Sequence, residues 1–140
     1  MPSLGTGSRV AHLMSTALVS VRDTDTLAIA RREMRQAGIH HLPVVDEHQN
    51  LIGVISRTDL PRGRRKPSPT ERIGKFMSRA VVTVTPETSL ARASELMLEN
   101  AFRSLPVVAS DGRLIGILTE TDLVRGMRAV DPPSTGTRAS

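Results

Sequence analysis

The chain has 140 residues, which is enough for one compact domain and fits two half-size units that share a core. It contains no cysteine, and this excludes disulfide bonds, cysteine-ligated zinc and a thiol nucleophile. The formal net charge is +5, from 19 basic and 14 acidic residues, which favours anionic partners such as nucleotides, nucleic acid or acidic proteins. Because no apolar run approaches the ~20 residues that span a bilayer and no signal-peptide core is visible, we expect a cytoplasmic protein without membrane contact.

An internal repeat with a constant offset of 63 residues organises the sequence. Residues 12–60 align with residues 75–123 without a gap, and 19 of the 49 aligned positions are identical. We therefore predict a single module made of two repeats. Its predicted parts are a flexible N-terminal arm (1–8), the first repeat (9–61), a basic linker rich in proline and arginine (62–71), the second repeat (72–130) and a disordered tail (131–140).

Each repeat begins with a short β-prone segment that is followed by a helix. Residues 19–21 and 82–84 both read valine, polar residue, valine, which is typical of a short strand. In the helix that follows, residues at 3-4-3 spacing form a stripe whose apolar members are expected to be buried. The stripes comprise Leu27, Ala30, Met34 and Ala37 in the first repeat and Leu90, Ala93, Met97 and Asn100 in the second. Gly38 suits a left-handed stop after the first helix.

A β-hairpin is expected after each helix. Pro43 and Pro106 are placed at the first residue of a strand, where the missing N–H is tolerated. In the second repeat, Asp111-Gly112 is typical of a type I′ turn. In the first repeat only Asn50 of the corresponding residues suits a positive φ, so we expect a looser turn there.

The end of each repeat carries a glycine inside a strand and then a short polar step into a helix. Gly53 and Gly116 lie in otherwise apolar strands, which predicts a close approach of backbone or ligand. Pro61 is expected to shorten the terminal helix of the first repeat. Each repeat therefore reads β-α-β-β-α, and we predict a mixed α/β (α+β) fold.

The ordered pattern M-S, V-x-V, L-A-x-A, L-P-V-V, L-I-G and T-D-L, occurring twice, resembles the cystathionine-β-synthase (CBS) domain as a tandem pair. The resemblance implies two β-α-β-β-α repeats packed about a pseudo-twofold axis. It also implies two clefts between the repeats that bind adenosine compounds such as AMP, ADP, ATP or S-adenosylmethionine, or less often NAD or a cyclic dinucleotide. Members of this family are generally regulatory, so the resemblance implies signalling to a separate, unidentified partner protein. It also implies a homodimer of two CBS pairs.

The family's nucleotide signature, G-h-h-[ST]-x-x-[DN], matches residues 53–59 and 116–122. The resemblance assigns Asp59 and Asp122 to the two ribose hydroxyls, which a carboxylate can accept together. Hydroxyl groups and free backbone N–H groups at the helix start suit phosphate. These hydroxyls belong to Ser56, Thr58, Thr119 and Thr121. Arg57 aligns with Glu120, which favours a polyphosphate in the first cleft. The same Thr-Asp step also caps a helix without any ligand, and both interpretations stay open.

Further site residues follow from the same resemblance. Residues just before and within Leu-Pro-Val-Val would reach phosphate or ribose, and the polar residues between the first valines would touch the base. They are His40, His41, Pro43, Arg103, Ser104, Pro106, Ser20 and Thr83. The paired histidines lack the carboxylate or cysteine spacing of a metal site, so we expect no metal.

Three functions compete. The first is a ligand-sensing regulatory module without chemistry of its own, because no nucleophile–base pair or phosphate-binding loop is visible. The second is nucleic-acid binding through the basic run that comprises Arg62, Arg64, Arg65 and Lys66, against which stands the near absence of aromatic residues for base stacking. The third is a ligand-free dimerisation scaffold. An enzyme is not expected.

Overall fold

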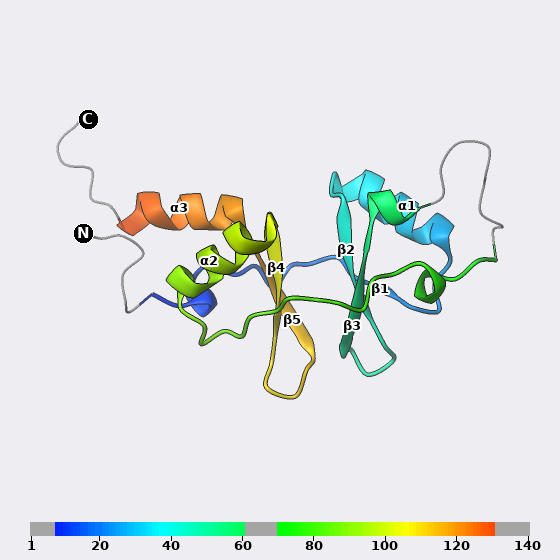
Figure 1. Cartoon of the computed structure of the whole chain (residues 1–140), viewed down its shortest axis with the longest axis horizontal. Helices are drawn as coiled ribbons and strands as arrows, with labels where there is room; N and C mark the ends of the chain where they lie inside the picture. The colour runs from blue at the N-terminus through cyan, green and yellow to red at the C-terminus, as the bar shows by residue number, and fades with distance from the viewer. Residues whose placement is uncertain (1–7, 61–69, 131–140) are drawn as a thin grey trace. The chain divides into compact units, whose positions relative to one another are not determined.

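The computed structural model describes residues 8–60 and 70–130. The predicted arm up to residue 7, Pro61, most of the predicted linker with its basic run, and the predicted tail 131–140 lie outside the described residues. The elements in chain order are η1 (Val10–His12), β1 (Val21–Arg22), α1 (Leu27–Ala37), β2 (His41–Val45), β3 (Leu51–Ser56), η2 (Arg57–Asp59), η3 (Ile73–Lys75), α2 (Leu90–Asn100), β4 (Ser104–Val108), β5 (Leu114–Thr119) and α3 (Glu120–Val130) (Figure 1).

The chain forms two compact units that do not coincide with the two repeats. Unit 1 comprises Met1–Ala17, Val82–Ser110 and Ile115–Ser140, and unit 2 comprises Leu18–Val81 and Asp111–Leu114. The segment that opens each repeat therefore belongs to the unit built around the other repeat. Val10, in η1, is fully buried in the core of unit 1, and Ile73, in η3, is fully buried in the core of unit 2.

Unit 2 contains a three-stranded sheet in the order β1-β2-β3, with α1 beside it (Figure 1). β2 and β3 form the predicted antiparallel hairpin, and β1 adds a parallel edge of two residues. Leu27, Ala30 and Met34 of the predicted α1 stripe are buried, whereas Ala37 in the last turn is exposed. The amphipathic pattern thus fails only at the helix end, where the stripe has left the sheet.

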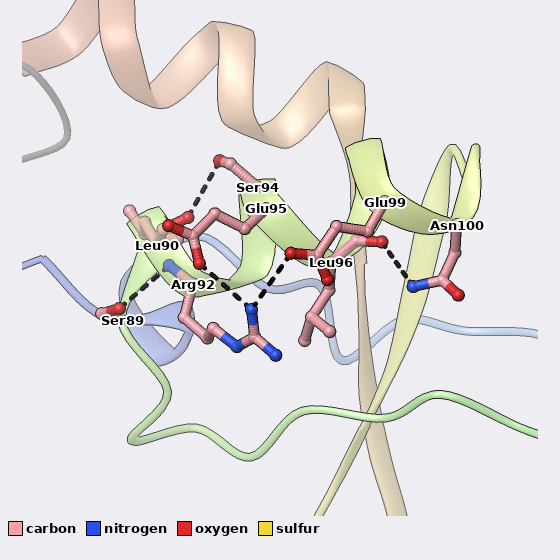
Figure 2. A network of polar contacts seen from close by, with 8 residues as sticks. All are labelled: Ser89, Leu90, Arg92, Ser94, Glu95, Leu96, Glu99 and Asn100. Atoms are coloured by element: carbon pink, nitrogen blue, oxygen red, sulfur yellow. Dashed lines mark hydrogen bonds and ion pairs between the residues drawn. The ribbon is translucent and has the colours of Figure 1, made fainter.

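Unit 1 repeats this plan with α2, β4 and β5, followed by α3. Leu90, Ala93 and Met97 are buried and Asn100 is exposed, so the second stripe also ends one member early. The Ser89 hydroxyl accepts a hydrogen bond from the backbone N–H of Arg92 at 3.0 Å and caps α2. Figure 2 shows this cap and the exposed network in which Arg92 contacts Glu95 at 3.1 Å and Glu99 at 3.6 Å.

Three details of the strands differ from the sequence prediction. The segment 82–84 forms no strand, and only Val84 makes a parallel bridge, to Val107. β2 and β4 begin two residues earlier than expected, so Pro43 and Pro106 lie within strands. Pro43 is tolerated because β1 pairs only with the two residues that follow it.

Positive φ angles occur at two positions, once in each repeat. Gly38 (φ 68°) aligns with Ala101 (φ 56°), and Gln49 (φ 71°) aligns with Gly112 (φ 93°). The predicted stop at Gly38 is confirmed. The type I′ prediction is wrong, because it requires two positive φ angles and Asp111 has none.

The hairpin turn of the first repeat also differs from its prediction. Gln49, not Asn50, takes the positive φ angle. Asn50 is instead held by Asp46, whose carboxylate accepts its backbone N–H at 2.9 Å and its side-chain N–H at 3.1 Å. Asn50 therefore stabilises the turn through its side chain rather than through its backbone.

The predicted close approach at the strand glycines is confirmed. A Cβ atom on Gly53 would lie 2.7 Å from the carbonyl oxygen of Ser78 and 2.8 Å from the sulfur of Met77. A Cβ atom on Gly116 would lie 3.0 Å from the carbonyl oxygen of Ser15. In each unit the glycine thus admits the backbone of the segment that opens the other repeat. Within residues 8–60 and 70–130, no helix is both long and apolar enough to cross a bilayer.

Candidate functional site

A cleft of about 880 Å³ opens in unit 2 at the C-terminal end of α1. This volume lies in the range of about 300–1,000 Å³ that is usual for small-molecule sites. The lining residues come from α1, the start of β2, the end of β3 and η2. They are Arg31, Met34, Arg35, Gly38, Ile39, His40, His41, Ser56, Arg57, Thr58 and Leu60.

Backbone hydrogen bonds fix the walls of this cleft. The N–H groups of Gly38 and Ile39 both donate to the carbonyl oxygen of Met34, which turns the chain sharply out of α1. The N–H of Arg57 then donates to the carbonyl oxygen of His40 at 2.8 Å. This bond brings the end of β3 against the segment that follows α1.

The predicted first-repeat site is largely assembled here. His40, His41, Ser56, Arg57 and Thr58 all line the cleft, although they come from two stretches separated by the β2–β3 hairpin. Residues of the family signature and residues before Leu-Pro-Val-Val therefore border one cleft, and their role in ligand binding stays a prediction.

Asp59 does not line the cleft but holds it in shape. Its Oδ2 atom accepts the backbone N–H of Ser56 at 2.7 Å and the hydroxyl of Ser56 at 2.9 Å. The hydroxyls of Ser56 and Thr58 lie 2.8 Å apart. The capping interpretation is thus realised, and the other oxygen of Asp59 carries none of these bonds.

The expectation that backbone N–H groups at this helix start are free for phosphate does not hold for two of them. The N–H of Ser56 is bound to Asp59, and the N–H of Arg57 is bound to His40. In unit 1 the N–H groups of Thr119 and Glu120 are occupied in the same way. An anion in the cleft therefore cannot use the N–H groups of Ser56 and Arg57.

Sequence reasoning missed two cationic residues of the cleft. Arg31 and Arg35 lie one turn apart on α1, on the side that faces the site rather than the core. With Arg57 they place three guanidinium groups in a cleft whose lining, among the described residues, contains no carboxylate. The signal was present as arginines at a spacing of four residues, but a cationic helix surface is usually only solvated, so the pattern alone did not indicate a site.

The matching region of unit 1 has the same backbone and different side chains. The N–H of Glu120 donates to the carbonyl oxygen of Arg103 at 2.9 Å. The Nε atom of Arg103 lies 3.9 Å from Oε1 of Glu120, with both side chains mostly exposed. Thr119 and Asp122 cap α3 reciprocally, with N–H to oxygen distances of 2.9 Å and 3.1 Å. Oδ1 of Asp122 lies 3.8 Å from Arg125.

The remaining predicted site residues lie apart from the residues that line the cleft. Pro43 and Pro106 are buried within β2 and β4. Ser20 is half-buried just before β1, and Thr83 is exposed. In unit 1, Ser104 is the first residue of β4 and Thr121 is exposed in the first turn of α3. Among the described residues, no group of three or more His, Cys, Asp or Glu side chains could hold a metal ion.

Comparison with known proteins gives matches over most of the chain. The family model described as CBS domain matches residues 10–63 and 73–129. The crystal structure of the CBS-pair protein CBSX2 from Arabidopsis thaliana is 32% identical with a TM-score of 0.82, covering 92% of this chain and 100% of that one. A structure of CBSX2 in complex with AMP is 30% identical with a TM-score of 0.79, covering 90% and 100%.

Two further matches belong to longer proteins. The cytosolic domain of the Mg²⁺ channel MgtE in complex with ATP is 33% identical with a TM-score of 0.73, covering 84% of this chain and 48% of that one. Homoserine O-acetyltransferase of Methanococcoides burtonii is 31% identical over 121 residues, which is 86% of this chain and 24% of the enzyme. The matching segment is thus a minor part of that enzyme.

Proposed function

We propose that this chain, which belongs to the CBS domain family, is a regulatory module that senses an adenine nucleotide of the AMP, ADP or ATP class. The observation that carries the proposal is the cleft of unit 2, where cationic and hydroxyl side chains converge without a carboxylate in the lining. CBSX2 binds AMP and the MgtE cytosolic domain binds ATP in the structures that resemble this chain, which supports the ligand class.

Phosphate is the group that this cleft suits best. A guanidinium group donates two parallel hydrogen bonds to phosphate oxygens, which gives direction as well as charge. The imidazoles of His40 and His41 also line the cleft, and each offers a ring N–H donor. The hydroxyl of Thr58 lies beside Arg57 but already donates to the hydroxyl of Ser56, because the proton of Ser56 is used by Asp59.

Ribose recognition is assigned to Asp59, which stands between the lining residues Thr58 and Leu60 in the sequence but is not itself among the lining residues. Its Oδ2 atom is committed to Ser56, which fixes the orientation of the carboxylate. The second carboxylate oxygen is then available to accept a ribose hydroxyl. In unit 1 the equivalent role falls to Asp122, whose Oδ1 atom lies 3.8 Å from Arg125.

The module has no catalytic step of its own in this proposal. Nucleotide binding changes the stability and geometry of the CBS pair, and a separate protein reads that change. A homodimer of two CBS pairs is the proposed assembly in which this happens. The sensing step can be tested without knowing the partner.

The test is thermal unfolding of the whole chain with AMP, ADP, ATP, S-adenosylmethionine, NAD and cyclic dinucleotides, each at millimolar concentration. A ligand at 100 times its Kd adds about 2.7 kcal/mol, which raises Tm by several degrees in a chain of this size. The Arg57→Ala variant should lose most of the shift, whereas Arg79→Ala, which removes an exposed arginine outside the cleft, should keep it. No shift with any adenosine compound would overturn the proposal.

A further inference from the structure

We infer, on the basis of the proposed function, that the cleft of unit 2 selects adenosine polyphosphates over AMP and rejects S-adenosylmethionine. Arg35, together with Arg31, is the specificity-determining feature. Neither residue belongs to the signature that identifies the ribose and phosphate positions. Their contribution follows from where α1 ends and from a comparison of the two repeats.

Two arginines place positive charge where α1 borders the cleft. Arg35 lies in the last turn of α1 and lines the cleft, as does Arg31 one turn earlier. Carbonyl oxygens at the C-terminal end of a helix carry partial negative charge, which repels a phosphate chain. An arginine in the last turn offsets this charge, so Arg35 makes this end of the cleft accessible to an anion.

Arg35 and Arg57 have no acidic side chain within ion-pair distance, among the described residues, that competes with a ligand for their charge. Among residues 8–60 and 70–126, neither Arg35 nor Arg57 forms an ion pair. Arg32, by contrast, lies 3.8 Å from Glu33 and does not line the cleft. Arg35 and Arg57, two of the three arginines that line the cleft, therefore have no ion-pair partner in that part of the chain that competes with a ligand.

The second repeat has different residues at the positions of Arg31 and Arg35 and provides an internal comparison. Ser94 stands where the first repeat has Arg31, and its hydroxyl donates to the carbonyl oxygen of Leu90 at 2.9 Å (Figure 2). Leu98 stands in place of Arg35, and it is 83% exposed. The hydrocarbon side chain of Leu98 offers nothing to a phosphate.

The charge at the third cationic position is reversed as well. Glu120 replaces Arg57, and it lies 3.9 Å from Arg103. All three arginines of the unit 2 cleft are thus replaced by neutral or acidic residues on the same backbone. Unit 1 gains a cation at an aligned position in Arg103, which replaces His40, but Glu120 offsets its charge, and we assign the polyphosphate to unit 2 alone.

The charge of the cleft determines which adenosine ligand it favours. The backbone N–H groups of Ser56 and Arg57 are occupied, so we expect discrimination among ligands to depend mainly on side-chain charge. Each added phosphate brings negative charge that guanidinium groups can bind. S-adenosylmethionine carries a positive sulfonium group instead, and three arginines in one cleft disfavour it.

The experiment is isothermal titration of the full chain with adenosine, AMP, ATP, S-adenosylmethionine and sodium tripolyphosphate. The Arg35→Leu variant installs the residue that α2 has at this position, and leucine and arginine have nearly the same helix propensity. Arg32→Leu removes the same charge from the same helix outside the cleft and serves as the matched control. Arg57→Glu converts the third position to that of unit 1.

We expect Arg35→Leu to weaken ATP binding by about tenfold or more, which corresponds to the loss of one charge-assisted hydrogen bond. AMP binding should change by less than about threefold, and adenosine binding should not change. Tripolyphosphate should bind to the wild-type chain at one site, and Arg35→Leu should weaken that binding. Arg32→Leu should leave the ratio of ATP to AMP affinity unaltered.

Two results would overturn the inference and are distinguishable from failure of the proposed function. If nucleotides bind but Arg35→Leu changes the ratio of ATP to AMP affinity no more than Arg32→Leu, selection by α1 is wrong while nucleotide sensing stands. If S-adenosylmethionine binds as tightly as ATP and Arg57→Glu affects both equally, charge selection is wrong. If no adenosine compound binds the wild-type chain, the proposed function fails and the inference with it.

Discussion

The backbone N–H of Arg57 donates to the carbonyl oxygen of His40, and at the same place in the second repeat Glu120 donates to Arg103, at 2.8 Å and 2.9 Å. The bond is identical although one repeat has arginine and histidine and the other has glutamate and arginine. This main-chain bond is thus kept whatever side chains flank it, and those side chains determine what the corner can bind.

Removal of the carboxylate at Asp122 should destabilise the chain modestly. Asp122→Ala breaks the reciprocal hydrogen bonds with Thr119 at the start of α3, and the loss of such a cap costs about 1 kcal/mol. Urea unfolding monitored by circular dichroism measures this loss. Asp122→Asn keeps an acceptor and should retain most of the stability. A loss well above 2 kcal/mol in Asp122→Ala would show that the residue does more than cap.

The strand glycines should differ in their tolerance of a methyl group. Gly53→Ala places a Cβ atom 2.7 Å from the backbone of Ser78, whereas Gly116→Ala places it 3.0 Å from that of Ser15. Because the contacts involve backbone atoms that cannot rotate away, we expect a cost of about 1–3 kcal/mol for Gly53→Ala and a smaller one for Gly116→Ala. Denaturant midpoints of the two variants test this order. Equal stability of both variants and the wild type would contradict the tight packing.

The paired left-handed positions should respond in opposite directions to substitution. Gly38→Ala should destabilise the chain by about 1 kcal/mol through backbone strain, since the new Cβ atom meets nothing within 4 Å. Ala101→Gly and Gln49→Gly should each stabilise it by a fraction of that amount, because glycine adopts a positive φ without strain. Ala91→Gly, at an exposed position within α2, is the control and should be destabilising. Destabilisation by Ala101→Gly as large as by Ala91→Gly would contradict this account.

The turn at Asp46 should lose its contribution in acid. Hydrogen bonds from Asn50 and His48 hold the pKa of the Asp46 carboxyl below its ordinary value of 3.8, with the Asn50 side chain as the largest cause. A carboxylate with a depressed pKa in the folded state stabilises the fold above the unfolded pKa of 3.8, and this contribution disappears as the pH falls through the lower folded value. We expect Asp46→Asn to flatten the dependence of unfolding free energy on pH below about 4. Denaturant unfolding between pH 3 and pH 6 measures it, and an unchanged slope would argue against the role of Asp46.

Much of the fold could be predicted because it is written in local patterns. The α1 and α2 stripes, the two hairpins and the stop at Gly38 follow from periodicity and from backbone preferences of single residues. The close approach at Gly53 follows from the presence of a glycine inside an otherwise apolar strand. Family resemblance added the site residues that meet around His40 and Arg57.

What could not be predicted depends on contacts distant in the sequence. Gln49 takes a positive φ because Asp46 holds the turn around it, and no preference of glutamine indicates this. Nothing in the sequence around Val10 indicates that this residue is buried in the core built around the second repeat. The sequence around Arg35 is typical of a solvated helix surface. Its place in the cleft depends on the end of α1 and the end of β3 bordering the same space.

The exchanged opening segments have a consequence for how the two halves can vary over time. Because Val10 completes the core of unit 1 and Ile73 completes that of unit 2, neither half of the duplicated sequence is whole without the other. A duplication with this architecture cannot shed one copy without exposing the apolar face that the lost copy covered. Each core therefore depends on both copies, whereas the recognition surface of one copy can differ in chemistry from that of the other, as Arg57 and Glu120 do.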